Sequence, residues 1–144
     1  MNKPNILQRI RPDILSMQAY ASARSLASAT ENMIFLDANE VPFEPFKDAT
    51  HFNRYTPQQP ASLVEGMADL YGARTENLLV TRGADEAIDV VTRLFCTPGG
   101  DNILICPPTF PMYEMSARIH GTAVKKVLLT PDFQLDTKAV LQAA

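Results

Sequence analysis

The order of apolar segments predicts an α/β fold with a mostly parallel sheet. Beyond Pro60, short apolar runs alternate with segments of helical periodicity, and glycine or proline lies at most of the junctions. The resulting order is strand, helix, strand, helix, strand, in which helices connect successive strands as right-handed crossovers. We therefore expect an opening βαβαβ arrangement preceded by a separate N-terminal segment.

Two helices are predicted in the first half of this region. Ser62 and Glu65 have the spacing of a capping box, the following apolar residues recur at helical intervals, and Gly72 ends the segment. The second helix begins at Ala84 and ends before Pro98, where a Pro-Gly-Gly sequence breaks the pattern.

Three strands and two later helices complete the predicted order. Thr109 is in position to cap a helix that ends at Gly121, and a further helix begins near Asp136. The apolar runs predicted as strands span residues 78–81, 102–106 and 123–129.

The first sixty residues predict an arm that lies over another part of the protein. They contain one short strand candidate, residues 33–36, and many polar and proline residues. Pro42 and Pro45 exclude regular structure between them, because proline lacks an amide donor and has a fixed φ.

The composition is that of a globular protein and excludes several classes of function. The chain has 144 residues, of which 46% are hydrophobic and 20% charged, with a formal net charge of −3. This charge gives no electrostatic support for a nucleic-acid partner. No apolar run approaches the roughly 20 residues that cross a bilayer. Residues 1–11 lack the apolar core of a secretory signal, so we expect a cytoplasmic protein.

The cysteines and histidines do not predict a metal or redox site. Cys96 and Cys106 lie in apolar runs, and we expect two buried thiols, with a disulfide as the alternative. His51 and His120 have no cysteine or paired carboxylate at ligand spacing, so no metal is expected. A Gly-x-Ser-x-Gly sequence for a nucleophilic serine is also absent.

The loop at residues 81–86 is the first candidate ligand site. In a parallel sheet, ligands bind where strands lead into helices. Gly83 allows a sharp turn there, and the amides of Ala84 and Asp85 lie at a helix N-terminus, which favours an anion such as phosphate. The alternative is plain capping, in which Asp85 and Glu86 complement the helix dipole.

The loop at residues 107–113 is the second candidate. Its prolines make it stiff and place the aromatic ring of Phe110 just beyond a strand, where it suits a flat cofactor. The alternative is that Phe110 packs in the core of the following helix, and for Tyr113 this core role is the better interpretation.

Five segments together resemble the N-terminal part of histidinol-phosphate aminotransferases, which are pyridoxal 5'-phosphate (PLP) enzymes of the aspartate-aminotransferase fold. The resemblance covers nearly the whole chain from Ile10 onward, in matching order and spacing. The segments are AYASAR at 19–24, LDANE at 36–40, NRY at 53–55, TRGADEAID at 81–89 and PPTFPMY at 107–113.

The resemblance implies roles for four cofactor-binding residues. The backbone amides of Ala84 and Asp85 would hold the PLP phosphate, and Phe110 would stack on the pyridine ring. Tyr55 would reach into the partner subunit and bind the cofactor phosphate there, which implies a homodimer.

Two further residues, Tyr20 and Asn39, would line the substrate pocket according to the resemblance. The alternative for Tyr20 and Tyr55 is an ordinary amphipathic tyrosine at the surface.

The sequence departs from the residues that are usual in the family at several positions. Phe110 stands where the family usually has Tyr, and Pro111 stands where it usually has Gly. The sequence departs again at Val41, usually Asn, and at Thr56, usually Pro.

The resemblance also implies a domain organisation. Residues 1–56 would form the N-terminal arm and the start of a small domain. Residues 57–144 would form the first, incomplete part of the PLP-binding large domain, within the three-layer architecture of fold type I.

The activity implied is the transamination of histidinol phosphate with 2-oxoglutarate to imidazole acetol phosphate and glutamate, a step of histidine biosynthesis. In the family the Schiff-base lysine lies beyond the part that this chain matches, so no catalytic residue is expected here. We expect the 144-residue chain alone to be inactive, with weak or absent PLP binding.

Two alternatives remain open at this point. The motifs also suit another PLP enzyme of this fold, such as a phosphothreonine decarboxylase or an aromatic aminotransferase. From a different class, the chain suits a short non-catalytic module that binds a phosphorylated ligand or pairs with another subunit.

Overall fold

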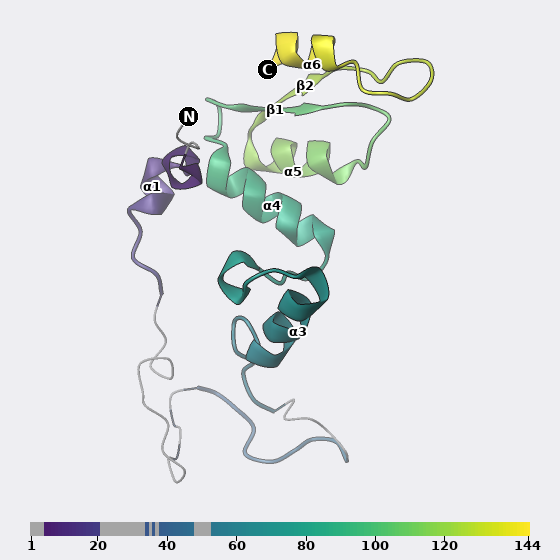
Figure 1. Cartoon of the computed structure of the whole chain (residues 1–144). Coiled ribbons are helices and arrows are strands. Elements are labelled where there is room, and N and C mark those ends of the chain that lie inside the picture. Colours follow the sequence, from purple (N-terminus) through teal and green to yellow (C-terminus); the bar gives the residue numbers. More distant parts are fainter. Residues whose placement is uncertain (1–4, 21–33, 35, 37, 48–52) are drawn as a thin grey trace. The chain divides into compact units, whose positions relative to one another are not determined.

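The computed structural model describes residues 5–20, 34, 36, 38–47 and 53–144 (Figure 1). Its contacts divide the chain into two compact units. The first unit comprises Met1–Met17 and Thr81–Ala144, and the second comprises Gln18–Val80. The expected division at residue 56 remains a prediction about the complete domains.

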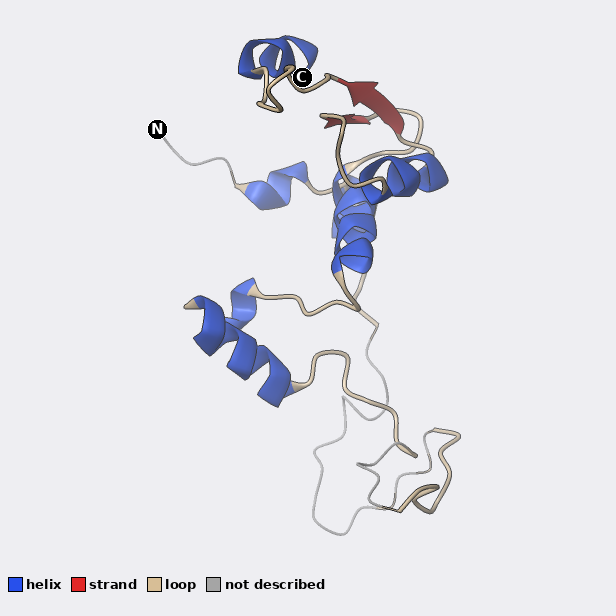
Figure 2. Ribbon diagram, turned by 90° about the vertical axis from the view of Figure 1, so that its right-hand side faces the viewer, coloured by secondary structure: helices blue, strands red, loops and turns tan. Residues whose placement is uncertain are grey.

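The first unit is a mixed α/β structure with a two-stranded parallel sheet. Strand β1 (Asn102–Ile105) pairs with β2 (Ala123–Lys126), and Asn102 lies opposite Ala123. Helix α5 (Met112–His120) connects the two strands and packs against both of them and against α4 (Ala84–Phe95). The short helix α6 (Thr137–Ala143) lies on the opposite side of the strands from α5 (Figures 1 and 2).

The predicted α4, β1, α5, β2 and α6 are confirmed, with shorter strands than expected. Pairing continues beyond β2, because the amides of Val127 and Leu129 donate to the carbonyls of Ile105 and Pro107 at 3.1 and 2.9 Å. Gly121 ends α5 with a φ of 79°, as its position in the sequence indicates. Asp136 caps α6 by accepting a hydrogen bond from the Ala139 amide.

The cap predicted for α5 is wrong. Pro111, not Thr109, precedes the helix, and its backbone already has right-handed helical angles. The helix therefore begins at Met112, later than the sequence pattern indicated.

Two small side chains of α5, Ser116 and Ala117, are buried where it packs against α4 and the sheet. Ala117 of α5 is fully buried, and Ile105 of β1 is 7% exposed. The hydroxyl of Ser116, which is 2% exposed, donates to the Asp89 carboxylate of α4 at 3.3 Å. The close approach of the two helices therefore depends on small residues and one polar contact.

An N-terminal segment belongs to the first unit. It contains the 3-10 helix η1 (Ile6–Arg9) and the single turn α1 (Pro12–Leu15). The Arg11 amide donates to the Leu94 carbonyl at 3.0 Å, and the Arg11 guanidinium donates to the Arg93 carbonyl at 3.3 Å. In Figure 1, α1 accordingly lies beside the C-terminal end of α4.

The second unit contains the helix α3 (Ala61–Tyr71) and the 3-10 helix η2 (Thr75–Asn77). Val64 and Ala68 form the buried face of α3, and Gly72 ends it with a φ of 60°. The predicted capping box is not formed, because the helix already begins at Ala61 and Pro60 occupies the cap position. Ser62 is therefore inside the first turn.

The strand predicted over residues 78–81 is not formed, so the βαβαβ layout is not confirmed. The Val80 amide donates to the side-chain oxygen of Gln59, and the Gln59 amide donates back to the Val80 carbonyl, both at 2.9 Å. A glutamine side chain thus supplies the pair of hydrogen bonds that a neighbouring strand would supply.

The arm contains little regular structure where it is described. Residues 38–47 form bends without helix or strand, as Pro42 and Pro45 predict. Of the strand candidate at 33–36, residues 33 and 35 lie outside the described residues, and Ile34 and Leu36 have no regular structure. No helix in the described ranges is long and apolar enough to cross a membrane.

Candidate functional site

The turn before α4 leaves its first backbone amides open. Gly83 has a φ of 85°, which favours glycine, and a Cβ built on it meets no atom within 4 Å. Gly83 occupies the cap position and offers no side chain, and among the described residues no acceptor contacts the amides of Ala84 and Asp85. Within the described residues these donors are therefore free at the positive end of a helix of 12 residues.

Hydrogen bonds fix the conformation of this turn. The Gly83 amide donates to the Thr81 carbonyl at 2.8 Å, and the Thr81 hydroxyl donates to the Gly83 carbonyl at 2.9 Å. The Glu86 carboxylate accepts from the Arg82 amide at 2.5 Å. The turn is therefore held in place without use of the Ala84 and Asp85 amides.

The Glu86 carboxylate also pairs with the Arg82 side chain. Their closest atoms are 2.8 Å apart. Hydrogen bonds from the Arg82 guanidinium and amide lower the pKa of Glu86, and the carboxylate raises the pKa of Arg82. Of the two acidic residues considered as capping groups, Glu86 therefore holds the turn, while Asp85 is exposed and its side chain makes no hydrogen bond or ion pair within the described chain.

The second candidate loop places Phe110 at the surface. Phe110 is 49% exposed and packs edge to face with Tyr113, with ring centroids 6.2 Å apart. Much of the Phe110 ring is thus available to a ligand. Tyr113 is 41% exposed and lines a pocket. The core role that the sequence favoured for Tyr113 is therefore wrong, because its ring stays largely exposed beside Phe110.

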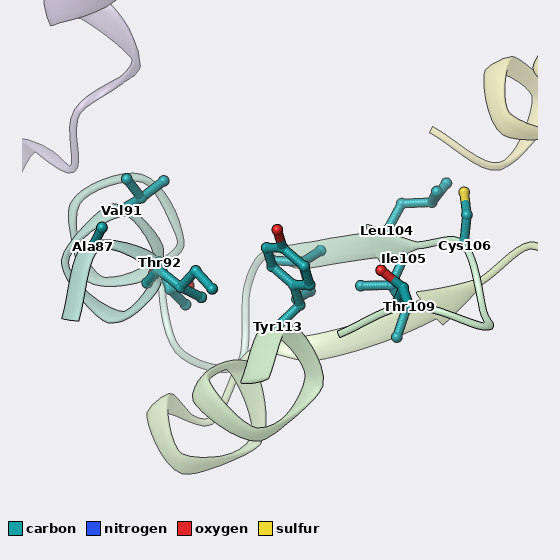
Figure 3. A pocket seen from close by; sticks show the side chains of 10 residues that line it. Ala87, Val91, Thr92, Leu104, Ile105, Cys106, Thr109 and Tyr113 are labelled. Atoms are coloured by element: carbon teal, nitrogen blue, oxygen red, sulfur yellow. The ribbon is translucent and has the colours of Figure 1, made fainter. Parts of the chain in front are cut away.

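A pocket of about 550 Å³ lies between α4, β1 and the start of α5 (Figure 3). The Tyr113 ring points into the space between α4 and β1. No lining residue is charged: the residues are Ala87, Ile88, Val91, Thr92, Ile103, Leu104, Ile105, Cys106, Thr109 and Tyr113. Ala84, Asp85 and Phe110 do not line it, but their near neighbours Ala87 and Thr109 do. The pocket thus reaches the second candidate loop at Thr109, but none of residues 81–86 of the first loop lines it.

In the second unit, two of the predicted residues lie on motifs that contact each other. Tyr55 is 68% exposed, and its amide donates to the Glu40 carboxylate at 2.7 Å. Glu40 follows Asn39, which is exposed. Tyr20 is 82% exposed in a segment without regular structure. The side chains of Tyr20, Asn39 and Tyr55 are therefore accessible to a ligand or partner.

Three polar contacts were missed by the sequence reasoning. They involve Glu40, Gln59 and the Asp89–Ser116 pair. Glu40 and Asp89 lie inside the motifs at 36–40 and 81–89 that carry the resemblance. Their place in these motifs is the signal that could have indicated a structural role. Gln59 lies in an ordinary polar stretch and carries no such signal.

The cysteines and metal-ligating side chains add no further site. Cys96 and Cys106 are both free thiols, and burial raises the pKa of Cys96, which is the opposite of activation. Within the described ranges, no group of three or more His, Cys, Asp or Glu side chains is arranged to hold a metal ion.

Phosphate-binding α/β enzymes have a parallel sheet and a helix N-terminus with free amides after a glycine, and both features are found here. The chain belongs to the family described as aminotransferase class I and II, which it matches over residues 24–144. It is similar to histidinol-phosphate aminotransferase of Pseudoalteromonas atlantica, with 42% identity over 91% of this chain and 36% of the relative.

Two further relatives carry the same description. Histidinol-phosphate aminotransferase 1 of Pasteurella multocida is 46% identical over 88% of this chain and 36% of its own length. The enzyme of Stenotrophomonas maltophilia is 41% identical over 97% of this chain and 39% of its own length. The chain thus spans little more than a third of the curated relatives that it matches.

Proposed function

We propose that this chain is the N-terminal part of a PLP-dependent aminotransferase that converts histidinol phosphate and 2-oxoglutarate to imidazole acetol phosphate and glutamate. The observation that carries the proposal is the 41–46% identity to histidinol-phosphate aminotransferases across most of this chain. The reaction would belong to histidine biosynthesis in the cytoplasm.

The described residues fit the phosphate and the ring of PLP. The Ala84 and Asp85 amides have no acceptor in the part of the chain that the structure describes, and a Cβ built on Gly83 meets no atom of that part within 4 Å. Phe110 offers a half-exposed aromatic face on the loop of residues 107–111. When bound, PLP supplies an electron sink for bonds at the amino-bearing carbon. The chain's own part is to hold the phosphate and orient the ring.

Tyr55, Tyr20 and Asn39 complete the proposed site. Tyr55 would bind the cofactor phosphate in a partner subunit, which makes the functional form a homodimer. Tyr20 and Asn39 would contact the substrate. The exposure of Tyr20 and Tyr55, 82% and 68%, is compatible with contacts to a ligand or partner outside the described chain.

We expect the lysine that links covalently to PLP to lie outside residues 1–144. The chain has five lysines, none in a matching sequence context: Lys3, Lys47, Lys125, Lys126 and Lys138. Lys126 pairs with Glu114 at 2.7 Å, and the Lys125 ammonium donates to the Ala143 carbonyl at 2.6 Å. The 144-residue chain alone would therefore bind PLP weakly or not at all, and would not transaminate.

The large domain proposed for the complete protein has a larger parallel sheet of fold type I, starting at residue 57. Large apolar side chains of the first unit are exposed, among them Leu128 at 71% and Leu141 at 78%. A parallel sheet needs cover on both faces, so these side chains and the apolar pocket suit contact with further elements of such a domain.

The proposal is tested with the protein encoded by the complete gene. We expect a Ser-x-x-Lys sequence in frame beyond Ala144, and activity on histidinol phosphate with 2-oxoglutarate. Activity on phosphothreonine or on aromatic amino acids instead would identify another fold-type I enzyme. A stop codon after Ala144 would favour the non-catalytic module.

A separate experiment tests the expected inactivity of residues 1–144. The isolated chain is incubated with PLP, reduced with borohydride and weighed by mass spectrometry. We expect no stoichiometric adduct, because no lysine has the matching context. A stoichiometric lysine adduct would overturn this part of the proposal.

A further inference from the structure

Glu40 has a nearly buried carboxylate that contacts the residues around Tyr55. Its side chain is only 5% exposed. One carboxylate oxygen accepts from the Tyr55 amide at 2.7 Å, and the other accepts from the Arg54 guanidinium at 3.0 Å. Both oxygens therefore have donors, one of them cationic, as a carboxylate removed from water requires.

A second contact joins the same two segments. The Asn53 side-chain amide donates to the Val41 carbonyl at 2.9 Å. Residues 38–47 form neither helix nor strand, and the same is true of residues 53–60. Because no backbone ladder holds these segments, the side chains of Glu40 and Asn53 provide the described hydrogen bonds between them.

The two segments carry two of the residues proposed to act on ligands. Asn39 immediately precedes Glu40, and Tyr55 is the residue whose backbone Glu40 holds. The Tyr55 ring is 68% exposed, so its own packing does little to fix its position. The position of its backbone therefore depends strongly on the Glu40 contact.

We propose that Glu40 is a positioning residue that holds Tyr55 and Asn39 in a fixed relation, and so places the Tyr55 hydroxyl for the cofactor phosphate. This inference rests on the cofactor role proposed for Tyr55. Glu40 does not itself contact the cofactor. It acts through the Tyr55 main chain, with Arg54 neutralising its charge.

Variants at position 40 separate the hydrogen bond from the charge. Glu40→Ala removes both, so the Tyr55 amide and the Arg54 guanidinium lose their acceptor. Glu40→Gln keeps a carbonyl oxygen for the Tyr55 amide but loses the ion pair. Glu76→Gln is the matched control, because Glu76 pairs with Arg74 in the same unit at 3.2 Å but is 61% exposed and far from these motifs in sequence.

The first measurement is hydrogen exchange at the Tyr55 amide in the ligand-free protein encoded by the complete gene. Losing a hydrogen bond to a charged acceptor speeds local exchange by about ten-fold or more, so we expect this in Glu40→Ala. Glu40→Gln should increase the exchange rate of the Tyr55 amide by less, and Glu76→Gln should leave it unchanged. Unchanged exchange in Glu40→Ala would overturn the proposal.

The second measurement is a double-mutant cycle on PLP affinity with Tyr55→Phe. If Glu40 acts through Tyr55, Glu40→Ala weakens PLP binding by about ten-fold in the native background and by less than about two-fold in the Tyr55→Phe background. An equal loss in both backgrounds would contradict positioning through Tyr55. A merely structural role would give that equal loss.

The cycle also separates this inference from the proposed function. If Tyr55→Phe alone leaves PLP affinity unchanged, the cofactor role of Tyr55 is wrong, and positioning for the phosphate is overturned with it. Faster Tyr55 exchange in Glu40→Ala would then still establish that Glu40 holds this backbone. If Tyr55→Phe weakens binding but Glu40→Ala does not, only the role of Glu40 is wrong.

Discussion

The backbone amide of Arg11 donates a hydrogen bond of 3.0 Å to the carbonyl oxygen of Leu94. The last carbonyls of a helix have no partner within the helix, and Arg11 supplies donors to two of them, because its guanidinium reaches the Arg93 carbonyl. The same guanidinium pairs with Asp13 at 2.6 Å. These hydrogen bonds attach the N-terminal segment to the C-terminal end of α4. The proposed phosphate site lies at the other end of this helix.

Replacing Arg11 should loosen this segment. In Arg11→Ala the charged donor to the C-terminal end of α4 is lost, so we expect a lower melting temperature and faster hydrogen exchange at Ile14 and Leu15. Arg9→Ala is the control, because Arg9 is exposed at the end of η1 and makes no side-chain contact within the described residues. Equal exchange in the two variants would contradict this account of Arg11.

Replacing either of two glycines in the second unit by alanine should change the free energy of unfolding, with opposite signs at the two positions. Gly72 ends α3 with a φ of 60°, so Gly72→Ala should destabilise the protein by roughly 1–2 kcal/mol. Gly66 lies inside α3 with no atom within 4 Å of a built Cβ, so Gly66→Ala should stabilise it by roughly 0.5–1 kcal/mol. Denaturant unfolding of both variants measures the difference. The same sign of change in both would contradict the backbone argument.

Acid should weaken the contact between α5 and β2. Hydrogen bonds from Lys126 and Arg118 lower the pKa of Glu114. A carboxylate with a lowered pKa stabilises the folded state above its unfolded pKa, and this contribution is lost as the pH falls through the folded pKa. Glu114→Gln should therefore lower the melting temperature at about pH 7 and lower it less at about pH 3.

The control for this pH dependence is Glu65→Gln. Glu65 is an exposed residue of α3 that makes no ion pair within the described chain. We expect its melting curve to follow that of the native protein across the titration. If Glu114→Gln loses the same amount of stability at both pH values, the loss of the ion pairs of Glu114 is not the cause of the lower melting temperature.

Phe110 should contribute to cofactor affinity through its aromatic face. Stacking of this kind is worth about 0.5–1.5 kcal/mol, so Phe110→Ala should weaken PLP binding by about two- to ten-fold. Phe110→Tyr keeps the face and should bind within about two-fold of the native protein. Spectroscopic titration with PLP measures both. Unchanged affinity in Phe110→Ala would place the ring away from the cofactor.

The sequence predicted the elements that local patterns determine. The structure confirms the helical period of α4, the strand β1 and the helix-ending glycines at positions 72 and 121. Each of these features depends on near neighbours in the chain. Helix starts were less predictable, because Ser62 and Thr109 have the right side chains but the chain begins its helical turns at other residues.

Contacts between distant residues could not be predicted. A strand requires a partner, and residues 78–81 have the composition of one, yet the backbone of Val80 pairs with the Gln59 side chain instead. In the candidate site, the turn before α4 follows from Gly83 and the sequence around it. The burial of Glu40 against Arg54 and Tyr55 depends on how two irregular segments fold together.

The most direct test of the proposed phosphate site is the PLP affinity of Ala84→Pro in the protein encoded by the complete gene. Ala84 is the first residue of α4, where proline is tolerated, so the change removes one amide donor and leaves the helix intact. Ala61→Pro makes the same change at the first residue of α3. We predict about ten-fold or more weaker binding for Ala84→Pro and unchanged binding for Ala61→Pro. Equal affinity in the two variants would contradict a phosphate site at the start of α4.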